Sequence, residues 1–126
     1  MVVGTGIDLV PVARLRRFRE RRAERGLRRL FTDAELGYCL RLAAPDRSLA
    51  ARFAAKEAFF KAIGTGYGRE GGGWRDVEVL REASGRPGIR LHGRAARYAE
   101  QRGIRRIHLS LSHTDDVAAA IVLLEG

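Results

Sequence analysis

The chain has 126 residues, of which 45% are hydrophobic, a length that suits one domain spanning residues 1–126. Its apolar runs are far shorter than the roughly 18 residues of a membrane span, which excludes an integral membrane protein. The net charge of +9 predicts an anionic partner, whether nucleic acid, phosphate-rich cofactor, membrane surface or acidic protein. A single cysteine, Cys39, and the lack of a signal-peptide pattern predict a cytoplasmic protein.

The first third of the chain predicts a strand and two helices. Val2–Leu9 is β-branched and punctuated by glycines, which is typical of a short strand. An arginine-rich helix follows from Val12, with an interruption at Gly26. Residues 32–35 form a capping box, which opens a short second helix that we expect to end near Pro45.

A third helix is predicted over Ser48–Ile63, closed by Gly64. It is apolar nearly all round, so we expect it to be buried. Four alanines share one stripe, and their small side chains allow a close approach to a sheet or another helix. They are Ala51, Ala55, Ala58 and Ala62.

After a glycine-rich stretch over Gly64–Gly73, the chain predicts four strands and one short helix. The strands are Trp74–Leu80, Ile89–His92, Ile107–Ser112 and Val117–Leu124, and the helix is Arg94–Arg102. A turn at residues 85–88 joins the first two strands into a hairpin, and a turn at residues 113–116 joins the last two. We therefore expect an α+β fold in which an antiparallel sheet packs against the long buried helix.

Glu57 is the most informative polar residue, because a carboxylate in a buried helix must meet a cation or lose its charge. One interpretation is a salt bridge to Lys61, one helical turn further on. The other is a metal site. Asp8, where the first strand is expected to stop, would supply a second oxygen for Mg²⁺, although an aspartate at a strand end is often only a turn or cap residue.

Two further features could meet a ligand. His113 lies at the mouth of the last predicted hairpin, where it could contact a ligand or be a turn histidine without a role. Glycines 64, 66 and 68 could let the backbone approach a phosphate. They follow a helix rather than a strand, which rejects a dinucleotide-binding fingerprint and leaves a helix C-cap as the alternative.

The basic residues are uneven in kind and in place. All except Lys56 and Lys61 are arginines, which for exposed positions fits a general preference for arginine. The first predicted helix has nine arginines and only Glu20 and Glu24 against them. Such a face is often simply solvated, but so large an excess of one charge also suggests docking to an acidic surface.

The sequence contains, in order, the segments GIDLVPVARL, FTDAEL, RFAAKEAFFKAIGTG, WRDVEV, GRP and SLSHT. Together they resemble the holo-acyl-carrier-protein synthases, the small 4'-phosphopantetheinyl transferases, through nearly the whole chain. The most specific part of the resemblance is Arg52–Gly66.

The resemblance implies that Asp8 and Glu57 hold Mg²⁺. It implies transfer of the phosphopantetheine arm of coenzyme A to a serine of an acyl carrier protein, with release of adenosine 3',5'-bisphosphate. Lys61 would bind the phosphate and stabilise the leaving group, and His113 would contact phosphate or a water on the metal. The general base is open between Glu57 and such a water.

The family also implies a homotrimer with active sites in clefts between subunits. It implies that Arg14 contacts an acidic helix of the carrier protein, and the charge of the arginine-rich helix adds Arg21 as a second contact. The predicted contacts to coenzyme A are Arg52, Lys61, Gly64, Ser112 and His113.

Two functions of other classes compete with this one. The first is a small basic nucleic-acid-binding domain whose arginine helix follows phosphates, which explains the charge but not Glu57. The second is a catalytically silent scaffold for acidic partners. With the family resemblance included, we expect no nucleic-acid partner and no membrane partner.

Overall fold

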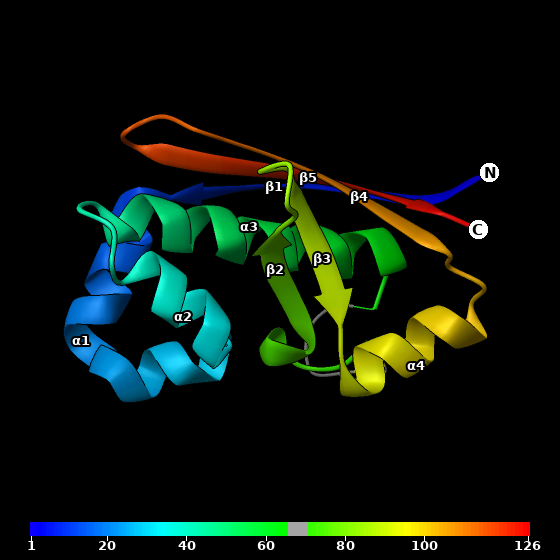
Figure 1. The fold of residues 1–126 in the computed structure, drawn as a ribbon, viewed down its shortest axis with the longest axis horizontal. Coiled ribbons are helices and arrows are strands. Elements are labelled where there is room, and N and C mark those ends of the chain that lie inside the picture. The colour runs from blue at the N-terminus through cyan, green and yellow to red at the C-terminus, as the bar shows by residue number, and fades with distance from the viewer. Residues whose placement is uncertain (66–70) are drawn as a thin grey trace.

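The computed structural model describes residues 1–65 and 71–126, which form a three-stranded antiparallel sheet, a separate two-stranded hairpin and four α-helices (Figure 1). The elements are β1 Val2–Pro11, α1 Val12–Leu30, α2 Asp33–Cys39, α3 Pro45–Ile63, a 3₁₀ turn Trp74–Asp76, β2 Val77–Arg81, β3 Pro87–Leu91, α4 Gly93–Gln101, β4 Arg106–His113 and β5 Val117–Glu125. No helix within these described residues is long and apolar enough to cross a membrane.

The larger sheet has the strand order β1-β5-β4, and α3 runs along one face of it (Figure 1). Side chains of β1 alternate between a buried face toward α3 and an exposed outer face. Gly4 and Gly6 lie on the buried face, where an added Cβ would stand 2.3 Å from the Ala62 carbonyl oxygen and 1.9 Å from that of Ala58. The predicted close approach of the alanine stripe to a sheet is confirmed, and glycines on the facing strand make it possible.

The long helix α3 is buried as predicted, but it begins at Pro45 rather than Ser48. Proline suits the first helical position, because the N–H that it lacks would have no partner within the helix there. Gly64 ends the helix with φ 79°, in the left-handed region, and its N–H donates to the Phe60 carbonyl oxygen at 3.0 Å.

The arginine-rich helix α1 is interrupted at Ala23, with φ 51°, and not at Gly26 as the sequence predicted. Gly26 is buried, and a Cβ there would lie 2.2 Å from the Arg22 Cβ. Its lack of a side chain therefore allows close packing against Arg22, across the interruption at Ala23.

The capping box of α2 is present, since the Thr32 hydroxyl accepts from the Glu35 N–H at 3.2 Å and the Glu35 carboxylate accepts from the Thr32 N–H at 2.8 Å. The helix ends at Cys39, well before Pro45. The residues between them form turns that lead into α3.

The hairpin of β2 and β3 is confirmed, but its first strand begins at Val77 instead of Trp74. Residues 74–76 form a 3₁₀ turn, in which the Asp76 carboxylate accepts from the Gly73 N–H at 3.0 Å. The hairpin lies beside α3 (Figure 1), and its strand β3 is also close to β4, the edge strand of the three-stranded sheet.

Candidate active site

The structure brings Asp8 together with two residues of α3, Glu57 and Lys61. Asp8 lies inside β1, opposite Ala120 of β5, so the prediction that it ends the strand was wrong. Pairing with β5 extends β1 to Pro11 and turns the Asp8 side chain toward α3. The Lys61 ammonium donates to Asp8 Oδ1 at 2.8 Å and to the Ile7 carbonyl oxygen at 3.0 Å.

Glu57 does not make the salt bridge to Lys61 that helix spacing allowed. Its ion pair is with Arg14 of α1, whose Nη2 lies 3.8 Å from Glu57 Oε1, while Lys61 turns to Asp8. Burial raises the pKa of Glu57, and the neighbouring Asp8 carboxylate raises this pKa further. The two carboxyl groups therefore share one small, electronegative site.

This pair of carboxylates suits a hard divalent cation. Asp8 Oδ2 is buried and has no hydrogen-bond partner within the described residues, which is costly for a carboxylate oxygen. No group of three or more potential metal-binding side chains occurs in the described part of the chain. Mg²⁺, however, commonly takes one or two protein carboxylates and completes its shell with phosphate and water. The donor set fits that pattern, and the metal role stays a prediction.

Lys61 adds an exposed positive charge at the edge of the site. Its side chain is 55% exposed, and the hydrogen bond to Asp8 raises the pKa of its ammonium group. It is therefore charged at neutral pH and accessible to an anionic ligand.

A second feature is a basic cavity of about 550 Å³ between α2, α3, β2 and the end of β4. Arg52 is buried at its wall, with Nη1 donating to the Ser48 hydroxyl at 2.6 Å and Nε without a hydrogen-bond partner among residues 1–65 and 71–126. Its guanidinium lies 4.7 Å from the centre of the Tyr38 ring, and Arg81 lies 5.5 Å from the same ring. Such a group of cations can bind phosphate.

His113 is the last residue of β4 and also lines this cavity. The neighbouring Ser112 belongs to the opposite face of the strand, because side chains alternate along β4. Arg52 and His113 therefore both line the cavity, whereas Ser112 is turned to the outer face of the sheet within one chain. Gly64 is the C-cap of α3, and the glycines at 66 and 68 lie outside the described residues.

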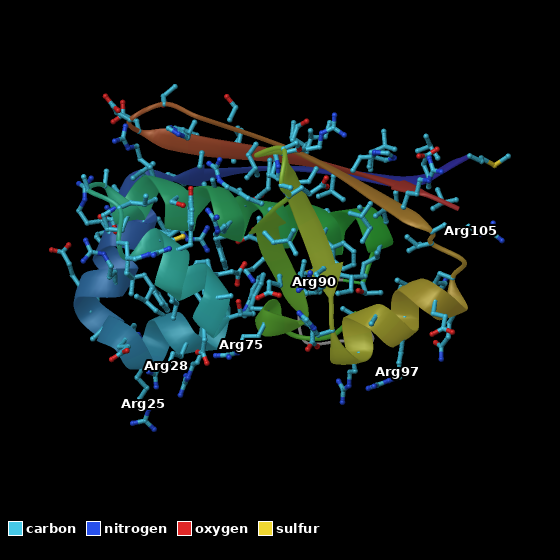
Figure 2. The ribbon with its side chains drawn as sticks, in the orientation of Figure 1. Arg25, Arg28, Arg75, Arg90, Arg97 and Arg105 are labelled. Carbon is cyan, nitrogen blue, oxygen red and sulfur yellow. The ribbon has the colours of Figure 1, made fainter. Side chains whose placement is uncertain are left out.

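The arginines of α1 fall into two groups. Arg19 donates two hydrogen bonds, of 2.7 and 2.9 Å, to the Asp46 carboxylate of α3. These hydrogen bonds lower the pKa of Asp46 below its usual value. Arg21 is exposed to solvent, and Figure 2 shows Arg25 and Arg28 pointing outward from the second half of the helix. Part of the predicted docking charge is thus used to hold α1 on α3.

Sequence reasoning missed the cavity residues Tyr38 and Arg81. They come from α2 and β2 and meet only in the folded chain, so no local spacing marks them. The only available signal was the excess of arginine, which does not distinguish one arginine from another.

A family model described as "4'-phosphopantetheinyl transferase superfamily" matches residues 4–122. The chain is 51% identical over 125 residues to the holo-[acyl-carrier-protein] synthase of Koribacter versatilis (strain Ellin345), covering 99% of each chain. The crystal structure of the synthase from Neisseria meningitidis has a TM-score of 0.92 at 34% identity and full coverage of both chains. The Helicobacter pylori synthase in complex with coenzyme A has a TM-score of 0.84 at 28% identity, covering 96% of this chain and 99% of that one.

The chain therefore belongs to the 4'-phosphopantetheinyl transferase superfamily. Within it, the relatives over the full length of the chain place it among the holo-[acyl-carrier-protein] synthases, so it is an enzyme. The resemblance seen in the sequence motifs is confirmed, as is the α+β fold with its antiparallel sheet.

Proposed function

We propose that this enzyme transfers the 4'-phosphopantetheine arm of coenzyme A to a serine of an acyl carrier protein. The serine oxygen attacks the β-phosphorus of the pyrophosphate, and the bond from that phosphorus to the bridging oxygen breaks. The bridging oxygen and its electron pair leave with adenosine 3',5'-bisphosphate. The serine proton passes to Glu57 or to a water that Glu57 orients.

The observation that carries this proposal is the pair of carboxylates beside a lysine. Asp8 and Glu57 would hold Mg²⁺, and this assignment is supported by Asp8 Oδ2, which has no hydrogen-bond partner in the described part of the chain. When bound, the metal would neutralise charge on the pyrophosphate. Lys61 is exposed and charged, and it would bind a phosphate oxygen and stabilise the leaving group.

The basic cavity supports a site for the nucleotide part of coenzyme A. Arg52 has a buried guanidinium without a carboxylate partner among the described residues, and a phosphate would supply the missing negative charge. His113 lies at the same cavity and would contact phosphate. Gly64 and Ser112 stay predicted contacts to coenzyme A.

The exposed face of α1 would receive an acidic helix of the carrier protein. Arg14 stands between this face and the carboxylate pair, so a carrier docked there would have its serine near the metal. Arg21 lies two turns further along the same helix and is exposed. Opposite charges on the two surfaces would increase the rate of encounter.

We further propose a homotrimer with sites in clefts between subunits. Ile7 and Leu9 on the outer face of β1 are 63% and 65% exposed, and Ile121 of β5 lies beside them. An apolar patch of this kind favours burial against another copy of the chain. Ser112 belongs to the same outer face, so a neighbouring subunit could bring it into a shared site.

The test is the mass of a purified apo acyl carrier protein after incubation with this enzyme, coenzyme A and Mg²⁺. We expect a gain equal to the phosphopantetheine arm, together with release of adenosine 3',5'-bisphosphate. The Glu57→Gln variant is the matched control and should leave the carrier unmodified. No gain with several carrier proteins would reject the proposal.

The alternative of a nucleic-acid-binding domain explains the net charge of +9 but gives no role to the paired carboxylates. The expectation of no nucleic-acid partner stays a prediction, and a DNA and RNA binding assay with the same preparation tests it. A single domain over residues 1–126 and a cytoplasmic location also stay predictions.

A further inference from the structure

Arg14 lies where the basic face of α1 meets the pair of carboxylates. Its Nη2 lies 3.8 Å from Glu57 Oε1, and its guanidinium stands 5.3 Å from the centre of the Phe53 ring. More than half of the Arg14 side chain, 55%, is exposed. The residue therefore reaches Glu57 from outside while one side of it faces the solvent.

Each of the two carboxylates forms an ion pair with a basic side chain of the same chain. Lys61 binds Asp8, and within the described residues the ion pair of Glu57 is with Arg14. A divalent cation on the same carboxylates would stand next to the Arg14 guanidinium, and the two positive charges would repel each other. The Arg14–Glu57 contact and a metal thus compete for one carboxylate.

The contact is also loosely held. A separation of 3.8 Å is longer than a hydrogen bond, and exposed ion pairs contribute little free energy. Arg19 on the same helix provides the contrast, because its two hydrogen bonds of 2.7 and 2.9 Å fix it on Asp46. Arg14 can therefore turn to a carboxylate of an incoming partner at low cost, whereas Arg19 cannot.

We infer that Arg14 is a positioning residue that couples carrier docking to metal binding. It holds Glu57 in the metal-free enzyme and releases it when an acidic carrier protein offers a carboxylate. The inference rests on the proposed function and adds to it a link between two ligands. Because such a link is reciprocal, the carrier must tighten metal binding by the same factor as the metal tightens carrier binding.

The test titrates metal-free enzyme with Mn²⁺ and follows free Mn²⁺ by electron paramagnetic resonance, without coenzyme A. In the parent, apo carrier protein should tighten Mn²⁺ binding about twofold to fivefold, the range set by losing one exposed ion pair. The Arg14→Ala variant should bind Mn²⁺ this much more tightly without carrier protein, and a saturating concentration of carrier protein should not change its Mn²⁺ affinity further.

Arg17→Ala is the matched control, since it removes the same charge one turn further along α1. No ion pair of Arg17 is found among the described residues, so its Mn²⁺ affinity without carrier should equal that of the parent. Equal Mn²⁺ affinities of Arg14→Ala and the parent would overturn the inference. An equal increase in Mn²⁺ affinity in the Arg14→Ala and Arg17→Ala variants would also overturn the inference, because the increase would then come from the change in net charge alone.

Glu57→Gln separates this inference from the proposed function. If it loses Mn²⁺ binding while Arg14→Ala behaves as the parent, only the coupling is rejected and the metal site stands. If Glu57→Gln binds Mn²⁺ as tightly as the parent, the metal assignment fails and the coupling fails with it. Transfer to the carrier is scored separately by mass.

Discussion

Two lysines five residues apart on α3, Lys56 and Lys61, each form an ion pair with a carboxylate, but the two ion pairs differ in burial and in hydrogen bonding. Lys56 is fully buried, and its ammonium donates to Glu35 at 2.9 Å and to two main-chain carbonyl oxygens at 2.9 and 2.7 Å. Lys61 is largely exposed and binds Asp8, whose second oxygen has no hydrogen-bond partner among the residues that the structure describes. The Lys56–Glu35 pair has its hydrogen bonds completed within the protein, and it therefore holds neighbouring elements together. The Lys61–Asp8 pair has an oxygen left over, and it can therefore bind a ligand.

Lys56→Ala should produce the largest loss of stability. Removing one partner of a buried ion pair leaves the Glu35 charge uncompensated, which costs about 3–5 kcal/mol of unfolding free energy. Lys61→Ala should cost less, because Lys61 is 55% exposed and water can replace it beside the buried Asp8. Chemical denaturation of both variants measures the difference, and similar losses in the two would remove the distinction between the pairs.

Asp8→Ala and Glu57→Ala should each lower transfer at least about a hundredfold, since each removes a hard oxygen ligand of the proposed metal. Circular dichroism should show an intact fold, and Mg²⁺ should no longer protect either variant against unfolding. Activity and thermal stability are measured together. A Glu57→Gln enzyme with parental activity and lower stability would make Glu57 a structural residue like Lys56.

Lys61→Ala should lower transfer about tenfold or more, and Lys61→Arg should lower it less, because a phosphate contact needs a positive charge at this turn of α3. His113→Ala should have a milder effect than Lys61→Ala. Coenzyme A titrations with each variant measure the loss. Parental kinetics of Lys61→Ala would contradict the phosphate role.

The arginines of α1 repeat the contrast between fixed and available charges. Reversal of Arg14 and Arg21 to glutamate should raise the Michaelis constant for carrier protein about tenfold and leave coenzyme A binding nearly unchanged. The salt dependence should flatten, because exposed charges are screened over about 8 Å at physiological ionic strength. Steady-state kinetics at several salt concentrations test this. Parental carrier kinetics with a loss of DNA or RNA affinity would assign the helix to nucleic acid.

Glu57→Gln should slightly raise the thermal stability of the metal-free enzyme near pH 7. Burial and Asp8 raise the pKa of Glu57, so the folded state holds more protons than the unfolded state above the ordinary glutamate pKa. Stability from this group is therefore present at low pH and is lost as pH rises through the raised pKa. Melting curves from pH 4 to 8, where the glutamine variant should lack this loss, check the sign.

The fold was largely predictable because its signals are local. Helix α3, its stop at Gly64 and the capping box at Thr32 each depend on residues within a few positions of one another. The errors are at boundaries that depend on distant partners. Pairing with β5 extends β1 beyond Asp8. Trp74 lies in a 3₁₀ turn instead of the predicted strand, and its carbonyl oxygen accepts a hydrogen bond from the Lys56 ammonium.

The candidate site was predictable in its residue types but not in its pairing. Charge and burial singled out Glu57, the expected end of the first strand suggested Asp8, and the family motifs agreed with both. Helix spacing predicted a Glu57–Lys61 bridge, yet the carboxylate on β1 bonds to Lys61 instead, and Arg14 from α1 approaches Glu57. These residues come from three elements, β1, α1 and α3, and the spacing of residues along the sequence does not predict contacts between distant elements. The roles of these residues stay predictions until the variants are measured.

Gly4 and Gly6 give the site an unusual form of robustness. Because main chain touches main chain where β1 crosses α3, the spacing between Asp8 and Glu57 is set without any intervening side chain. Directed evolution that repacks the core with larger or smaller hydrophobic residues should leave this spacing unaltered. A single methyl group at position 6 would push the strand off the helix, and an engineer should treat the two glycines as part of the active site.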